Sequence, residues 1–333
     1  MNKNIVKLVA LFNAYCDKNA HIVDDECFYS NLLETLANHK MFGIASYLLQ
    51  KGLMQNAPSR IYDVIFCSAE REKIKHKEYT TLCSEISTSL SQYGVPHVVR
   101  KGPTLGFLYK EAWHRGFNDL DFLINTSDRA QVLDFLKKND YNIGIYNTRL
   151  ETGIAPNRET LIQYRLNPDH LPHYYIKRDH TITRGFNVDF AFQLGWHNDE
   201  IKIKNEEVFQ DAVSRDGIAS MSDNWLFVDS ILHLYREMFF YGLAKAGPIK
   251  FISIIDILLL QDRVDFVSRP ATKEIIDIVT SFVNFTFGRS NKVDQKLLTG
   301  ILVNGQWQNL AVSIYDRMSI LTDQHYRDNF NLA

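Results

Sequence analysis

The sequence predicts an α+β fold in which a small mixed sheet is flanked by N-terminal and C-terminal helical regions. Apolar residues recur with helical spacing through much of residues 1–94 and again through 201–333. Between them, short β-branched and apolar runs bounded by turn residues are typical of strands. We therefore expect an N-terminal helical region (1–94), an α/β core (95–200) and a C-terminal helical domain (201–333).

The composition and charge are those of an ordinary globular protein. Hydrophobic residues make up 45% of the 333 positions and charged residues 23%. The chain has only 8 prolines and 16 glycines, which argues against long linkers. The 37 basic and 39 acidic residues give a net charge of -2. This near-neutral balance disfavours a long nucleic acid as the partner.

The cysteines and the N-terminus indicate a cytoplasmic location. None of the four cysteines lies in a C-x-x-C pair, which is typical of free thiols in a reducing compartment. Lys7 interrupts the first apolar run, which predicts an amphipathic helix rather than a signal peptide. No stretch approaches the roughly 18 apolar residues that a membrane span needs, so we expect no membrane partner.

Two helical stripes stand out in the N-terminal region. Apolar residues fall on one helical face over 42–49 and again over 82–93. The first helix is expected to end at Lys51-Gly52 and the second at Gly94. Glycine suits both positions because it readily adopts the left-handed backbone that follows many helices.

The expected core begins where β-branched residues replace these stripes. Pro103 is expected to begin a helix that runs to about residue 110, and Thr126 or Ser127 to cap another. A turn near Asp179-His180 would join the last two strands. The expected strands are 97–100, 119–124, 141–146, 174–177 and 186–192.

From about residue 203 the apolar pattern is helical again. No internal repeat or low-complexity segment interrupts it. The expected helices lie near 225–241, 249–260, 275–287 and 307–321.

Two acids lie two residues apart in the expected strand 119–124. Asp119 and Asp121 would point to the same face of a sheet, as side chains two apart on a strand do. Their neighbours are apolar, and burying adjacent carboxylates without a partner is costly. A hard cation such as Mg²⁺ is the natural partner, because it prefers carboxylate and phosphate oxygens.

A cationic turn lies upstream of these acids. Lys101-Gly102 precedes the helix expected at Pro103, and a glycine that opens a helix lets backbone N–H groups approach a phosphate. Lys101 adds a positive charge. Arg115, four residues before Asp119, is placed to reach a triphosphate. Lys101, Gly102 and Arg115 are therefore the predicted nucleotide-binding residues.

Asp189 is a third candidate acid, because it lies in the otherwise apolar strand 186–192. If that strand pairs with 119–124, three carboxylates converge. Such a site can bind two divalent metal ions that bridge an attacking hydroxyl and a triphosphate. Asp119, Asp121 and Asp189 are therefore the predicted catalytic and metal-binding residues.

These residues resemble the motifs of a known family. The run Val99-Arg100-Lys101-Gly102-Pro103-Thr104-Leu105, then Tyr109, Arg115 and Asp119-Leu120-Asp121-Phe122-Leu123-Ile124, is similar to the uncharacterised nucleotidyltransferase family of the polymerase-β-like superfamily. The resemblance extends from about residue 35 to about residue 260. It includes Val188-Asp189-Phe190 and the helix around Asp256.

The resemblance implies a nucleotidyltransferase core and a role for each acid. The first two acids, here Asp119 and Asp121, would bind both metal ions. The third, here Asp189, would bind one metal ion and help to deprotonate the acceptor hydroxyl. Lys101-Gly102 matches the turn that holds the triphosphate. The chain departs from many members at Pro103, where they have a small residue, and at Ala191, where they have a histidine.

Residues near the third acid are candidates for an acceptor pocket. Trp196-His197 follows the strand that carries Asp189. His170 and His173 are expected to be loop residues that line the pocket, since the spacing of common zinc motifs does not occur. Arg236-Glu237 is expected either to form a buried ion pair or to face the nucleotide.

We therefore expect a metal-dependent nucleotidyltransferase that moves a nucleoside monophosphate from an NTP, with ATP the expected donor, to an acceptor hydroxyl. The expected cofactor is Mg²⁺, with Mn²⁺ as a substitute. The acceptor would be a small molecule, a peptide or a protein. Two alternatives stay open: a glycosyltransferase, which also uses D-x-D to hold a nucleotide-sugar, and a catalytically inactive module with a binding or regulatory role.

Overall fold

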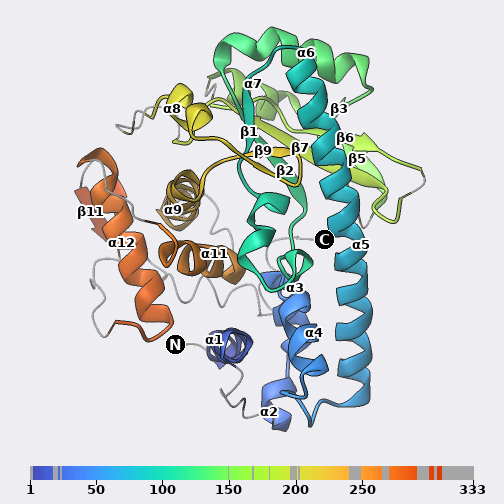
Figure 1. Ribbon diagram of the computed structural model, residues 1–333, viewed down its shortest axis with the longest axis vertical. Coiled ribbons are helices and arrows are strands. Elements are labelled where there is room, and N and C mark those ends of the chain that lie inside the picture. Colours follow the sequence, from blue (N-terminus) through green and yellow to red (C-terminus); the bar gives the residue numbers. More distant parts are fainter. Residues whose placement is uncertain are drawn as a thin grey trace.

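The computed structural model describes residues 3–17, 22, 25–148, 150–166, 169–179, 181–195, 201, 203–239, 249–264, 270–290, 300–303 and 306–309. Within these residues a seven-stranded mixed sheet lies between helices from both ends of the chain (Figure 1). This arrangement confirms the predicted α+β class with flanking helical regions.

The described N-terminal residues form helices that lead up to the sheet. The helix over 42–49 is confirmed as α4, and the stripe over 82–93 is the last third of the long helix α5. That helix ends just before Gly94, which has a φ of +69°. The helices are α1 (Lys3–Cys16), α2 (Glu26–Tyr29), α3 (Leu32–His39), α4 (Phe42–Gln50) and α5 (Ser59–Gln92).

The main sheet has the strand order β3-β6-β7-β2-β1-β9-β8. Pairing is parallel between β2 and β7 and between β1 and β9, and antiparallel between the other neighbours. Its strands are β1 (His97–Val99), β2 (Asp119–Ile124), β3 (Asn142–Ile143), β6 (Tyr174–Lys177), β7 (Gly185–Ala191), β8 (Val213–Arg215) and β9 (Ile218–Ser220).

Two expected elements of the core take a different form. The expected strand 141–146 is divided between β3 and β4 (Ile145–Asn147), because Gly144 between them has a φ of +131°. β4 leaves the main sheet and pairs with β5 (Thr152–Ile154). The expected helix at Pro103 is a 3₁₀ helix, η1 (Gly102–Leu108), and it is followed by η2 (Ala112–His114).

The region after residue 203 contains strands as well as the expected helices. β8 and β9 form a hairpin whose turn residues, Asp216 and Gly217, have positive φ values. The strands β10 (Gly300–Val303) and β11 (Gln306–Asn309) also pair. The start of the helix expected over 307–321 is therefore a strand, and the remainder of that range lies outside the described residues.

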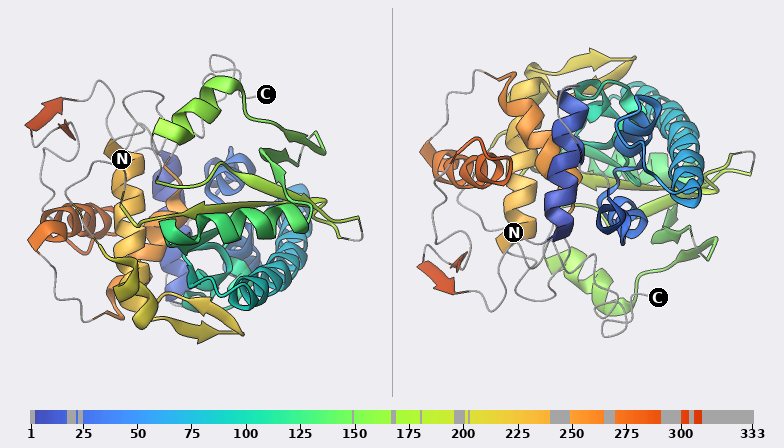
Figure 2. Two further views of the ribbon diagram at one scale, coloured as in Figure 1. Left: turned by 90° about the horizontal axis from the view of Figure 1, so that it is seen from above. Right: turned by 90° about the horizontal axis from the view of Figure 1, so that it is seen from below.

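The remaining helices follow β2 in the chain and include the helices of the C-terminal region. Three of them confirm the helices expected near 225–241, 249–260 and 275–287. In Figure 2, α5 and α6 lie on one side of the sheet and α7 on the other. The helices are η3 (Thr126–Asp128), α6 (Arg129–Lys138), α7 (Arg158–Leu166), α8 (Asn205–Gln210), α9 (Asp223–Phe239), α11 (Phe251–Gln261) and α12 (Pro270–Thr286).

Two apolar cores hold these elements together. The larger core joins side chains of α1, α3 and α4 to those of α9, α11 and α12. The smaller core lies between the sheet and the helices α5 and α6. In it the rings of Phe122 and Phe190 stack, with 5.4 Å between their centroids.

The predicted division of the chain at residues 94 and 200 stays a prediction. Among the described helices, none combines the length and apolar character that crossing a membrane requires.

Candidate active site

Three carboxylates lie on one face of the sheet. In the parallel pair of β2 and β7, Asp121 lies opposite Asp189, and Asp119 lies opposite Asn187. Leu120, which lies between Asp119 and Asp121, is buried in the smaller core, as are the other residues that alternate with the acids on both strands. Because successive side chains of a strand alternate between faces, the acids must point away from that core. The structure thus brings together the three acids that the sequence places on two separate strands.

In this arrangement the negative charges of the carboxylates repel one another. Burial raises the pKa of Asp121, and the charges of Asp119 and Asp189 raise it further. Oδ1 of Asp189 is buried and has no hydrogen-bond partner in the described part of the chain. A cation placed between β2 and β7 would relieve both penalties.

Lys101 supplies one positive charge to this site. Its Nζ lies 3.8 Å from Oδ2 of Asp121 and 3.3 Å from Nδ1 of His233 on α9. An ammonium can only donate, so Nδ1 accepts and the ring proton lies on Nε2. Nε2 lies 3.1 Å from Oε1 of Glu237, to which it donates. This chain of contacts fixes the position of Lys101 beside Asp121.

Further cations converge on Asp119 from elements that are distant in sequence. Loss of surrounding water opposes ionisation of Asp119, but the charges of Lys40, Lys101 and Lys250 hold its pKa below the ordinary value. Lys40 follows α3 and Lys250 precedes α11. Sequence reasoning missed both lysines, because each is an isolated residue with no motif around it. Only the tertiary fold places them beside Asp119.

A cavity of about 490 Å³ contains two of the three acids in its wall. Asp121 and Asp189 line one side, and Lys101 and Arg236 contribute positive charge. Arg236 lines the cavity, and Oε1 of Glu237 lies 3.1 Å from Nε2 of His233. The two alternatives expected for Arg236-Glu237 stay predictions. The cavity therefore combines carboxylates with cationic side chains, as binding of a metal ion and a phosphate requires.

Two histidines flank the third acid. Nδ1 of His173 lies 3.6 Å and Nδ1 of His170 lies 3.8 Å from Oδ1 of Asp189. The segment that carries them runs along β7, where the N–H of Leu171 donates to the carbonyl of Phe190 at 2.8 Å. Both histidines line the cavity. Trp196 and His197, the other predicted acceptor-pocket residues, lie outside the described residues.

Arg115 points to α11 and does not line this cavity. Its Nε and its second terminal nitrogen lie 2.9 Å and 2.7 Å from the two carboxylate oxygens of Asp256. The other terminal nitrogen donates to the carbonyl of Gly102 at 3.3 Å. The hydroxyl of Tyr109 also donates to Asp256, at 2.7 Å. Arg115 thus fastens the Lys101-Gly102 turn to α11.

Gly102 brings this turn into contact with the first acid. It has a φ of +70°, a backbone conformation that favours glycine. A Cβ atom at this position would lie 3.0 Å from the carbonyl oxygen of Asp119. The glycine therefore allows the turn to approach the start of β2 closely, which places Lys101 near the acids.

Two of the acids could hold a divalent cation together with oxygens of water and substrate. Among the described residues, no group of three or more His, Cys, Asp or Glu side chains forms a preformed metal site. Mg²⁺ is usually bound by one or two carboxylates, with water and substrate phosphate oxygens as the other ligands. Asp121 and Asp189 are register partners, and Oδ1 of Asp189 is buried with no hydrogen bond from the described residues, so the pair matches that requirement.

Comparison with known proteins identifies the family. The structure is similar to the crystal structure of an antigenic nucleotidyltransferase-like protein from Paracoccidioides brasiliensis. The sequence identity is 12% and the TM-score 0.38, over 63% of this chain and 88% of that chain. No curated protein matches the sequence. The model of a family described as uncharacterised nucleotidyltransferase matches residues 29–266, which is more than half of the chain. The chain belongs to this uncharacterised nucleotidyltransferase family.

Proposed function

We propose that the chain is a metal-dependent enzyme that transfers a nucleoside monophosphate from an NTP, with ATP the expected donor, to a hydroxyl of a small molecule, a peptide or a protein. Membership of the family supports nucleotidyl transfer in general. The observation that carries the finer proposal is the register of β2 and β7, which puts Asp121 opposite Asp189.

The side chains that line the cavity form two groups with different proposed roles. Lys101 and Arg236 offer positive charge to the triphosphate, which would bind on the α9 side of the cavity. Asp189 lies on the other side, beside His170 and His173, where an acceptor hydroxyl can be oriented. When bound by the three acids, Mg²⁺ or Mn²⁺ supplies neutralisation of the charge on the transferring phosphate.

The double variant Asp119→Asn with Asp121→Asn tests this proposal. We expect Mg²⁺-dependent consumption of labelled NTP to fall by about a hundredfold or more, since electrostatic stabilisation is the main source of such catalysis. The matched control is Asp63→Asn with Asp277→Asn, which makes the same chemical change at two exposed acids outside the cavity. Circular dichroism would establish that both variants remain folded.

The same assay separates the alternatives. Consumption of a sugar nucleotide with no binding of any NTP would indicate a glycosyltransferase. Binding of NTP without turnover in the presence of Mg²⁺ and Mn²⁺ would indicate a binding or regulatory module. Full activity of the Asp119→Asn, Asp121→Asn variant would show that the metal assignment is wrong.

A further inference from the structure

A larger cavity adjoins the acid-lined cavity. It has a volume of about 850 Å³, and both cavities are lined by Thr160, Tyr164 and His173. Asn187 of β7 also lines the larger cavity. Asn187 and Asp189 are two residues apart on one strand, so their side chains point to the same face roughly 7 Å apart. A molecule bound in the larger cavity can therefore reach Asp189 past His173.

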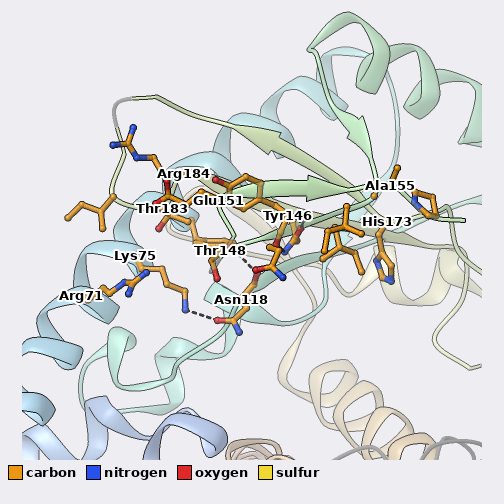
Figure 3. Close-up of a pocket in the computed structure, with 18 of the residues that line it drawn as sticks. Arg71, Lys75, Asn118, Tyr146, Thr148, Glu151, Ala155, His173, Thr183 and Arg184 are labelled. Carbon is orange, nitrogen blue, oxygen red and sulfur yellow. Dashed lines mark hydrogen bonds between the residues drawn. The ribbon is translucent and has the colours of Figure 1, made fainter. Parts of the chain in front are cut away.

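The end of the larger cavity away from the acids is cationic. Figure 3 shows Arg71 and Lys75 of α5, together with Arg184, at one end of the cavity and His173 at the other. Arg184 directly precedes β7. The cavity therefore has one end rich in positive charge and one end next to the third acid.

In the described part of the chain, the two arginines at the cationic end have no carboxylate partner. Lys75 is neutralised by Glu72, whose carboxylate lies 3.1 Å from its Nζ. Arg184 donates to the backbone carbonyl of Asp179 at 3.1 Å. No carboxylate in the described parts of the chain pairs with Arg184 or Arg71, although the exposed Glu151 also lines the cavity. Two guanidinium groups are thus available to bind an anion.

The wall between the two ends is largely apolar. It is formed by the β4–β5 hairpin and the residues after it. Ile145 and Ile154 line the cavity, and each is 49% exposed. The ring of Tyr146 and the side chains of Ala155 and Pro156 extend this surface. Such a wall suits the carbon skeleton of a small molecule, as most ligand pockets combine apolar walls with a few polar contacts.

We propose that this larger cavity binds the acceptor, and that the acceptor is a small hydroxylated molecule carrying an oxyanion group, either a carboxylate or a phosphate. This inference rests on the proposed nucleotidyl transfer. The oxyanion binds Arg71 and Arg184, the carbon skeleton lies along the hairpin, and the hydroxyl points past His173 to the acids. The hydroxyl oxygen forms a bond to the α-phosphorus, the bond from that phosphorus to pyrophosphate breaks, pyrophosphate leaves with the electron pair, and the hydroxyl proton passes to water.

Titration calorimetry on the full chain tests this assignment with two matched pairs of probes. One pair is 4-hydroxyphenylacetate and its neutral amide, and the other is glycerol 3-phosphate and glycerol. We expect the anionic member of at least one pair to bind more tightly than its neutral partner. The pair that shows the difference identifies whether a carboxylate or a phosphate is preferred.

Variants locate the binding to this cavity. In Arg71→Ala with Arg184→Ala, we expect the preferred anion to bind about tenfold more weakly or worse, because two charge-assisted contacts are lost. The control is Arg60→Ala with Lys73→Ala, which removes two exposed charges from the same helix outside the cavity and should leave binding unchanged. Equal weakening in both variants, or no preference for either anionic probe, would overturn the assignment.

Measurement of Mg²⁺·NTP binding in the same proteins separates this inference from the proposed function. Both double variants should retain NTP binding, since none of the four residues lines the acid cavity. Absence of NTP binding in the wild type, with anion binding intact, would contradict the proposed function. Normal NTP binding without anion binding at Arg71 and Arg184 would contradict only the acceptor assignment.

Discussion

At the residue scale, the closeness of the Lys101-Gly102 turn to Asp119 depends on one missing side chain. Gly102 and Gly94 have nearly the same backbone conformation, with φ values of +70° and +69°. A Cβ atom at Gly94 would meet nothing within 4 Å, whereas at Gly102 it would meet the carbonyl of Asp119 at 3.0 Å. Alanine at either position bears the energetic cost of a left-handed backbone, but only at Gly102 would it also press against the site.

We expect Gly94→Ala to lower the free energy of unfolding by about 1 to 2 kcal/mol, because it forces alanine into the left-handed region. Gly102→Ala should lower it by more, because its Cβ atom would also press against the carbonyl of Asp119. Only Gly102→Ala should displace the start of β2. Its NTP turnover should therefore fall by about tenfold, which is less than the hundredfold loss typical of a misplacement of 1 Å, because the carbonyl of Asp119 would move by a few tenths of an ångström. Urea unfolding and steady-state kinetics would measure both quantities. Equal turnover in the two variants would show that the contact with Asp119 does not matter.

The sequence located the three acids because each stands out against apolar neighbours on a strand. It also pointed to Lys101 and Gly102 through the turn that they form. It gave no sign of Lys40, Lys250 or the contact between His233 and Lys101, since these depend on packing between elements far apart in the chain. Arg115 was expected at the triphosphate, but its partner Asp256 lies 141 residues away and takes up its guanidinium.

At the element scale, buried ion pairs connect the core to the C-terminal helices. Arg115, just after η2, binds Asp256 of α11. Arg100, just after β1, binds Asp229 of α9 through Nε at 3.1 Å and a terminal nitrogen at 2.5 Å. Burial opposes ionisation of Asp229, yet Arg100 holds its pKa below the ordinary value. Each pair fixes a helix that contributes charge near the acids.

Removal of one partner should therefore be costly. We expect Asp256→Asn to lower the free energy of unfolding by about 3 to 5 kcal/mol, because the Arg115 charge stays buried without its counter-ion. The matched control is Asp134→Asn, which breaks the exposed pair with Lys138 on α6. That change should leave the free energy of unfolding nearly unchanged, because exposed ion pairs contribute little to stability. Chemical denaturation compares the two, and similar small losses would show that the buried pair does not clamp α11.

Elements with local signals were predicted well, and the omissions have identifiable causes. The stripes of α4, α9, α11 and α12 repeat over two turns or more, and the strands β2, β6 and β7 are short segments rich in apolar and aromatic residues. The β8–β9 hairpin was missed, although Asp216-Gly217 is a common hairpin turn sequence. The first two thirds of α5 lie within the region expected to be helical, but no individual helix was predicted there because charged residues interrupt its apolar stripe.

At the scale of the whole molecule, the larger core makes the two ends of the chain depend on each other. His39 at the end of α3 is fully buried, and its Nδ1 accepts from the N–H of Phe251, the first residue of α11, at 3.0 Å. Burial lowers the pKa of His39 to about 4. The pKa of His76 and of His114 is also lowered to about 4, mainly by burial.

These histidines should make the fold acid-sensitive. As pH falls from 6.5 toward 4, the unfolded chain takes up protons that the folded chain excludes, so the free energy of unfolding decreases. For His39 the loss is on the order of 3 kcal/mol across that window. Glutamine cannot titrate, so we expect the free energy of unfolding of His39→Gln, measured by urea unfolding, to decrease less steeply between pH 6.5 and pH 4. The same variant above pH 7 should follow the wild-type slope. Parallel curves throughout would exclude His39 as a source of the acid sensitivity.

The predicted α+β class is confirmed because the period of apolar residues changes from helix to strand and back along the chain. Strand order and the shared core could not be predicted in this way. They depend on pairings such as Val99 with Ser220 and on packing between α1 and α12, which no local pattern encodes.

We propose that Asp119, Asp121 and Asp189 bind the metal ion that accompanies an NTP. The most direct measurement is anomalous diffraction from crystals grown with Mn²⁺ and a non-hydrolysable ATP analogue. We expect a manganese peak about 2 Å from carboxylate oxygens of Asp121 and Asp189, with Asp119 as a further ligand and the triphosphate beside Lys101. A manganese ion bound elsewhere, or a bound nucleotide whose metal ion excludes Asp189, would contradict the claim.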